Sequence, residues 1–129
     1  MPPTHRMTAA KAVVESLRRL GLDTVFGLPG VHNLPLYDAL HGAPDIRHIL
    51  ARNESGAAFM ADGYARASGR PAALFTITGP GVLNAMTGVA EAHAASSPIL
   101  WIATEIPTHT RNEGKRGVFH ELDDQMALA

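Results

Sequence analysis

The sequence lacks cysteine and is poor in aromatic residues, with one Trp, two Tyr and four Phe among 129 residues. The absence of cysteine excludes a disulfide scaffold and cysteine-based zinc sites. Eleven Lys and Arg residues against twelve Asp and Glu residues give a formal net charge of −1. Because nucleic acids and anionic membranes attract a positive surplus, we expect neither as a partner.

Long apolar runs are also missing. No stretch approaches the roughly 20 apolar residues of a membrane-spanning helix, and no apolar segment follows the first residues as it would in a signal peptide. The cytoplasm is therefore the expected location. What the chain does have is alanine, which supplies much of its 46% apolar content. Such small side chains suit close helix packing and predict a thin core.

Apolar residues recur with helical and strand periodicity in alternation. Helices are expected at residues 8–20, 34–40, 54–68 and 82–95, and strands at residues 24–27, 46–51, 72–78 and 98–103. Strands of about five residues between helices of about 10 to 15 residues are typical of βαβ units, and near-continuous apolar strands indicate burial on both faces. We therefore predict an α/β fold whose parallel sheet carries helices on both faces.

The pattern changes beyond Thr104. A long polar loop runs to Glu121, and the helical pattern that starts there is cut off at Ala129. We expect a tail over residues 1–7 and one domain over residues 8–129 that is incomplete at its C-terminus.

Ligands of parallel sheets gather beyond the carboxyl ends of the strands. The segments expected there are residues 27–30, 52–54, 78–81 and 104–121. Gly79 and Gly81 match two glycines of a dinucleotide fingerprint, but Asn84 stands at the third position, so we reject nicotinamide binding. Alternatively, these glycines serve only a tight strand-to-helix turn. The sequence contains neither a P-loop nor a Gly-x-Ser-x-Gly nucleophile elbow.

Two ionisable residues stand out. Glu54 follows a strand and begins an alanine-rich helix, where the helix dipole would keep a carboxylate ionised. If Glu54 instead faced a cleft lined by Ala57 and Ala58, burial would favour its protonated form and make it a proton donor. The second residue is His120, but Asp124 replaces the second His of a zinc protease motif. We therefore expect no metal site.

Three blocks of the sequence together carry a family resemblance. Their residues are Val25-Phe26-Gly27-Leu28-Pro29-Gly30, Arg52-Asn53-Glu54-Ser55-Gly56-Ala57-Ala58-Phe59-Met60-Ala61-Asp62-Gly63-Tyr64-Ala65-Arg66, and Thr78-Gly79-Pro80-Gly81 with Asn84. In this order and spacing the blocks resemble the N-terminal pyrimidine-binding domain of thiamine-diphosphate enzymes, in the acetolactate synthase and benzoylformate decarboxylase-like group. The resemblance covers residues 8–124.

The resemblance implies roles for several residues. The family counterpart of Glu54 hydrogen-bonds a pyrimidine ring nitrogen of thiamine diphosphate and promotes the imino tautomer of the cofactor, which then acts on a 2-oxo acid. The cofactor-binding residues that the resemblance implies are Gly27, Pro29, Gly30, Glu54, Thr78, Gly79 and Asn84. His120 replaces a Gln common in acetolactate synthases, and Asn53 replaces a commoner His. The first change would let His120 face the substrate as an acid or base.

The sequence lacks the motifs with which the family holds the charged end of the cofactor. In the family, a C-terminal domain with Gly-Asp-Gly and a later Asn-Asn pair holds the diphosphate and its Mg²⁺, and this chain contains neither motif. The resemblance therefore implies a diphosphate-binding domain or subunit as partner, a homo-oligomer, and no turnover by the isolated chain. It leaves open whether FAD binds. The alternative is a non-catalytic dimerisation module, or a truncated inactive fragment, with alanine-rich helix faces that pack against a partner.

Overall fold

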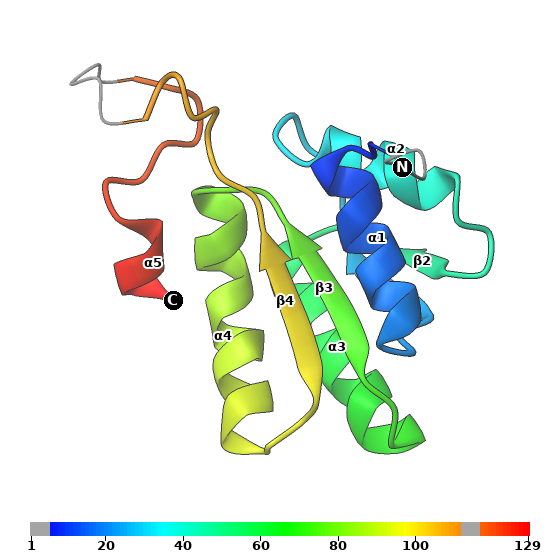
Figure 1. Cartoon of the computed structure of the whole chain (residues 1–129). Coiled ribbons are helices and arrows are strands. Elements are labelled where there is room, and N and C mark those ends of the chain that lie inside the picture. Colours follow the sequence, from blue (N-terminus) through cyan, green and yellow to red (C-terminus); the bar gives the residue numbers. More distant parts are fainter. Residues whose placement is uncertain (1–5, 112–116) are drawn as a thin grey trace.

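A four-stranded parallel sheet forms the centre of the structure (Figure 1). The computed structural model describes residues 6–111 and 117–129. Its strands are β1 (Thr24–Gly27), β2 (Arg47–Leu50), β3 (Ala72–Thr76) and β4 (Ile99–Ala103), in the spatial order β2-β1-β3-β4. Each neighbouring pair runs parallel, which confirms the predicted α/β fold.

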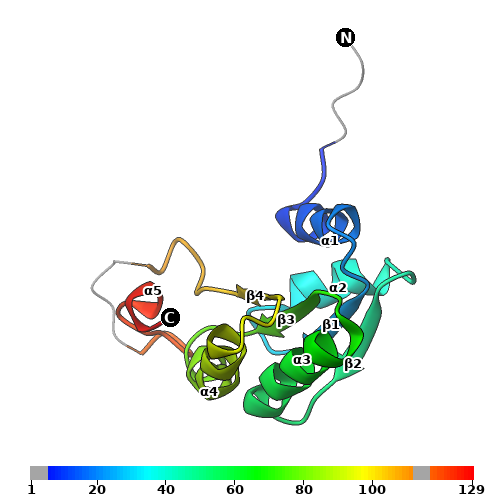
Figure 2. The same cartoon turned by 90° about the horizontal axis from the view of Figure 1, so that it is seen from below.

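Four helices alternate with these strands and form two outer layers. They are α1 (Ala9–Arg19), α2 (Leu34–His41), α3 (Glu54–Ser68) and α4 (Pro80–Ala94). Helices α1 and α2 cover one face of the sheet, and α3 and α4 cover the other (Figure 2). Val25 and Phe75 pack beneath the first pair, whereas Phe26 and Leu74 pack beneath the second, because successive strand side chains point to opposite faces.

Local signals decide where the helices begin and end. Oγ1 of Thr8 accepts a hydrogen bond from the backbone N–H of Lys11 at 3.2 Å, which satisfies a donor that the first turn of α1 leaves free. Pro80 lies in the first turn of α4, where its fixed φ favours a helix, so α4 begins before the predicted residue 82. Gly69 ends α3 with a φ of 68°, which glycine adopts without steric cost.

Central and edge strands differ in burial. Every residue of β1 and β3 is buried, as predicted for strands covered on both faces. The residues of β2 and β4 are exposed or half-buried, so the prediction of burial on both faces is wrong for these two strands. The reason is their position, since an edge strand has a neighbouring strand on one side only.

The alanine-rich sequence produces a close contact between α3 and α4. Ala57, Ala58 and Ala61 on α3 are fully buried. A Cβ added to Gly88 of α4 would lie 2.6 Å from Cβ of Ala58, which is closer than two carbon atoms can pack. The small-residue face of α3 is therefore used inside the chain.

The C-terminal segment forms one short helix, α5 (Gln125–Leu128). The predicted start at Glu121 is wrong, because Asp124 caps the helix instead: its Oδ1 accepts a hydrogen bond from the N–H of Ala127 at 2.9 Å. Residues 1–5 and 112–116, which hold most of the predicted tail and part of the polar loop, lie outside the described residues. None of the helices in the described ranges has the length and apolar character needed to cross a membrane.

Candidate functional site

The segments predicted to carry chemistry meet at the carboxyl edge of the sheet. β1 ends at Gly27 and β3 ends at Thr76, and parallel strands end at a common edge. From β1 the chain passes through α2 to β2 on one side, whereas β3 pairs with β1 on the other side. The connections therefore diverge between β1 and β3, and such a switch point is where open parallel sheets bind ligands.

Glu54 is buried at this edge, with 8% of its surface exposed. It is the first residue of α3, directly after Asn53, whose Oδ1 accepts a hydrogen bond from the N–H of Ser55 at 2.8 Å. Oε2 of Glu54 accepts a hydrogen bond from Nδ2 of Asn84 at 3.0 Å. Among the residues that the structure describes, no cation forms an ion pair with Glu54.

The two alternatives for Glu54 thus coincide in part. The carboxylate lies in the first turn of a helix and is also buried. The expectation of a cleft lined by Ala57 and Ala58 is wrong, because both alanines are fully buried in the core where α3 packs on its neighbours. What faces Glu54 instead is the first part of α4, through Asn84 and Gly81.

Ile77, the residue after β3, connects the turns that follow two strands. A Cβ on Gly30 would lie 2.7 Å from Cγ2 of Ile77, and a Cβ on Gly81 would lie 2.7 Å from its Cγ1. The added atom at Gly81 would also lie 3.6 Å from Oε1 of Glu54. Both turns and the carboxylate are therefore in one contact network. Sequence analysis missed Ile77, because an apolar residue after a strand carries no polar signal.

Gly27 packs against a buried hydroxyl. Its φ is 154°, and a Cβ would clash with the backbone oxygen of Phe75 and lie 2.7 Å from the hydroxyl of Tyr37. Burial raises the pKa of Tyr37 above its usual range, and the negative charge of Glu54 raises it further. Tyr37 therefore stays protonated, and its hydroxyl has no hydrogen-bond partner within residues 6–111 and 117–129.

Asn33 fixes the turn that follows β1. This side chain is fully buried. Its Oδ1 accepts a hydrogen bond from the N–H of Gly30 at 2.7 Å, and its Nδ2 donates one to the backbone oxygen of Leu28 at 3.3 Å. Pro29 lies between them and is exposed. Sequence analysis missed Asn33, although an Asn shortly after a Pro-Gly pair is a signal for a side chain that stabilises a turn.

His120 lies against the turn after β3. Gly79 has a φ of 65°, and the backbone oxygen of His120 packs so closely on it that any Cβ would clash. The ring of His120 lies 6.1 Å from the ring of His32, and Nε2 of His32 is 3.0 Å from the backbone oxygen of Phe119. The structure thus brings His120 and Gly79 together and adds His32, which sequence analysis missed.

Thr78 and Gly79 also contact a residue that sequence analysis did not select. The buried side chain of Gln125 accepts hydrogen bonds from Oγ1 of Thr78 at 2.7 Å and from the N–H of Gly79 at 2.9 Å. These contacts join the short helix α5 to the turn after β3, although the two are far apart in the sequence (Figure 1).

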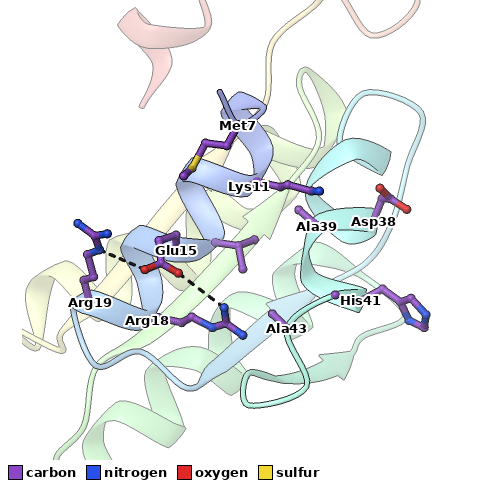
Figure 3. Close-up of a pocket in the computed structure, with 11 residues that line it drawn as sticks. Met7, Lys11, Glu15, Arg18, Arg19, Asp38, Ala39, His41 and Ala43 are labelled. Carbon is purple, nitrogen blue, oxygen red and sulfur yellow. Dashed lines mark hydrogen bonds and ion pairs between the residues drawn. The ribbon is translucent and has the colours of Figure 1, made fainter. Parts of the chain in front are cut away.

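Other features of the chain lie away from this edge. A groove of about 520 Å³ runs between α1 and α2, where Glu15 contacts both Arg18 and Arg19 (Figure 3). None of the predicted site residues lines this groove. Within the described ranges, no three His, Asp or Glu side chains gather in a way that could hold a metal ion.

Comparison with known proteins identifies the family of the chain. The family described as thiamine pyrophosphate enzyme, N-terminal TPP binding domain, matches residues 7–128. The chain belongs to this family. It is 50% identical over 129 residues to a probable 2-ketoarginine decarboxylase of Pseudomonas aeruginosa, and 44% identical over 102 residues to acetolactate synthase isozyme 1 large subunit of Escherichia coli. These matches cover 99% and 79% of this chain.

A solved structure shares the fold. It is the X-ray structure of a proposed thiamin diphosphate-dependent enzyme isolated from Mycobacterium smegmatis, with a TM-score of 0.74 and 33% identity over 81% of this chain. The chain spans only about a fifth of these family members: 22% of the Pseudomonas protein, 18% of the Escherichia protein and 20% of the Mycobacterium chain. What the structure describes is thus the pyrimidine-binding domain of a family of decarboxylases and acetolactate synthases.

Proposed function

We propose that this chain forms the pyrimidine side of a thiamine diphosphate site in a 2-oxo acid decarboxylase or carboligase. The observation that carries the proposal is the state of Glu54. Its carboxylate is buried, Asn84 holds Oε2, and Oε1 has no hydrogen-bond partner among the described residues. A carboxyl group without a cation can share a proton with a ring nitrogen. This donor set fits an aminopyrimidine.

Each residue at the edge has a part in this proposal. Thiamine diphosphate, when bound, supplies the electron sink for decarboxylation. Glu54 holds the proton at the pyrimidine ring nitrogen, and Asn84 orients its carboxylate. The proposed cofactor contacts in the two turns are Gly27, Pro29, Gly30, Thr78 and Gly79. The glycines among them let the turns pack closely on Phe75, Ile77 and His120, because a Cβ at any of them would clash with one of these residues.

A second protein part completes the proposal. We assign the diphosphate and its Mg²⁺ to a diphosphate-binding domain or subunit, because the chain spans about a fifth of the relatives that it matches and the sequence has no Gly-Asp-Gly motif. Turnover is then expected only when that part is present. FAD has no assigned place in this proposal.

The substrate is proposed to be a 2-oxo acid that faces His120. This residue reaches the same edge as Gly79 and lies beside His32, and an imidazole can act as acid or base near neutral pH. The Pseudomonas relative is named for 2-ketoarginine, so this compound leads the substrates to test. Pyruvate and benzoylformate are the other two.

A chimera tests the proposal directly. This chain replaces the matching segment of the Pseudomonas relative, and consumption of the three 2-oxo acids is measured with added thiamine diphosphate and Mg²⁺. We expect activity in the chimera and its loss in the Glu54→Gln variant, with Glu91→Gln on the exposed side of α4 as a matched control. Equal activity in the Glu54→Gln and Glu91→Gln variants would remove Glu54 from the mechanism.

Self-association is a second candidate function. The alanines of α3 are used inside the chain, but Phe59, Met60 and Leu83 on α3 and α4 remain exposed. Exposed apolar side chains of this size can form a contact with a second chain. Sedimentation velocity of the chain without cofactor tests this candidate: a dimer that Phe59→Glu dissociates supports it, and a monomer at all concentrations contradicts it.

A further inference from the structure

Gln125 ties three parts of the molecule together. It is the first residue of α5 and is buried, with 7% of its surface exposed. Its Oε1 accepts the hydrogen bonds of Thr78 and Gly79, and its Nε2 donates one to the backbone oxygen of Thr104 at 3.0 Å. One side chain thus joins the turn after β3, the end of β4 and the C-terminal segment.

Only a glutamine satisfies all three contacts. Its oxygen must face the two donors, Thr78 and Gly79, and its nitrogen must face the carbonyl of Thr104, so the amide orientation is fixed. Asparagine is shorter by one methylene group. Glutamate keeps the acceptor but has no donor for Thr104, and it would add a negative charge near Glu105, whose Oε1 lies 3.1 Å from Oγ1 of Thr78.

The contact continues from Gln125 to Glu54. Gly79 directly precedes α4, and the first turns of α4 carry Asn84, which holds the carboxylate of Glu54. The backbone oxygen of His120 packs on the same glycine. We propose that Gln125 is a positioning residue: it holds the turn after β3 so that Asn84 stays in place beside Glu54. Its importance for catalysis rests on the function proposed above, whereas the positioning itself does not.

The chain contains its own reporter for this arrangement. Trp101 is the single tryptophan of the sequence, and it lines a cavity of about 370 Å³ together with Val82, Gln125 and Met126. Its Nε1 donates a hydrogen bond to Oγ1 of Thr76 at 2.9 Å. Movement of α5 away from β4 would expose the indole ring. The fluorescence emission of Trp101 therefore reports whether α5 is docked.

Three variants of the chain test the positioning: Gln125→Leu, Gln125→Asn and Gln125→Glu. Hydrogen exchange of the Gly79 amide and the NMR signals of the Asn84 side-chain amide are measured in each, with Met126→Gln as a control at a residue that is 76% exposed. In the Leu and Asn variants we expect exchange of the Gly79 amide to accelerate about tenfold, the effect of one lost hydrogen bond. The Asn84 signals should shift as well.

The glutamate variant separates positioning from simple packing. It keeps the acceptor for Gly79, so we expect its Gly79 exchange to stay within about threefold of the natural chain. In the Leu and Asn variants, shifted Asn84 signals are the result that a purely local structural role of Gln125 would not produce. If Gln125→Leu does not fold, the contrast between Gln125→Asn and Gln125→Glu decides the question.

Two outcomes would overturn the proposal. The first is unchanged Gly79 exchange in the Asn variant. The second is a shift of Trp101 emission without any change at Asn84, which would limit Gln125 to anchoring α5. Neither outcome bears on cofactor binding by Glu54, which the chimera tests separately.

Discussion

The two edges of the sheet balance their buried charges differently. At the edge where the strands begin, the buried carboxylate of Asp62 forms an ion pair with Arg66 at 2.9 Å. At the edge where the strands end, the buried carboxylate of Glu54 has the amide of Asn84 as its one hydrogen-bond partner among residues 6–111 and 117–129. Both carboxylates lie on α3. A buried charge is costly unless it is paired, so the difference supports the ligand site that we propose at the end where Glu54 lies.

The ion pair between Asp62 and Arg66, at the first edge, where the strands begin, belongs to a network that joins α3, α4 and the segment before β4. Besides Asp62, the guanidinium of Arg66 contacts Glu91 of α4 at 3.0 Å and Ser97 before β4 at 3.3 Å. The hydrogen bond from Arg66 holds the pKa of Asp62 below its usual range, and the hydroxyl of Ser97 lowers it further. This network stabilises the fold. At the second edge, hydrogen bonds fix turns and leave Oε1 of Glu54 free within the described residues.

The sharpest test of this difference is Glu54→Gln in the chimera. Gln keeps the size and the contact with Asn84, but it cannot exchange a proton with a ring nitrogen. We expect 2-oxo acid consumption to fall by about 10³-fold, while the free energy of unfolding of the isolated chain changes by less than about 1 kcal/mol. A loss of stability clearly above this limit would show that Glu54 contributes to the stability of the fold.

Gly27→Ala tests whether the second edge, where the strands end and Glu54 lies, also depends on close packing. The added Cβ would clash with the backbone of Phe75 and the hydroxyl of Tyr37, and backbone cannot move aside easily. We expect a loss of about 3 kcal/mol in urea unfolding. The control is Gly63→Ala, where a Cβ meets nothing within 4 Å; in a helix interior it should stabilise by about 0.5 to 1 kcal/mol.

Asp62→Asn is the counterpart of the Glu54 variant. It removes a buried charge, but Arg66 is 45% exposed and water screens the ion pair. We therefore expect a loss of only about 1 kcal/mol in urea unfolding, with activity of the chimera unchanged at saturating cofactor. A loss of turnover without a loss of stability would contradict the assignment of the first edge to folding.

The smallest expected effect is a pH dependence that comes from the first edge. Hydrogen bonds from arginines lower the pKa of Asp23 and Asp62 in the folded chain. A lowered pKa means that the contribution to stability is present above the unfolded value of about 3.9 and is lost as the pH falls through the folded value. Below pH 4 we expect the midpoint of thermal unfolding to drop by roughly 3 °C more in the natural chain than in Asp62→Asn.

Much of the fold could be predicted from local patterns. The starts of α1 and α3 and the end of α3 follow from Thr8, Asn53 and Gly69, because caps and a left-handed glycine act within one turn. The predicted helix start at Glu121 is wrong, since the three apolar residues Leu122, Met126 and Leu128 give only a weak periodicity and the cap at Asp124 competes with it. The exposure of β2 and β4 could not be predicted either, because strand order is not a local property.

The site shows the same division. Glu54 and the glycines of both turns follow from motifs that lie close together in the sequence. Asn33 has a local signal as well, since it follows a Pro-Gly pair and bonds to Gly30 and Leu28 nearby. Gln125 and Ile77 have none, because their importance comes from contacts. The hydrogen bonds of Gln125 with Thr78 and Gly79 join segments more than 40 residues apart.

The sequence by itself determined the alternation of helices and strands, the family, and the presence of a carboxylate at the start of α3, because each depends on neighbouring residues. Only the tertiary structure decided that Glu54 is buried with no cation beside it in the described part of the chain, while Asp62 is paired with Arg66. It also decided that α5 reaches the turn after β3. Burial, pairing and long-range hydrogen bonds are set by which surfaces the folded sheet brings together, and no local pattern encodes that choice.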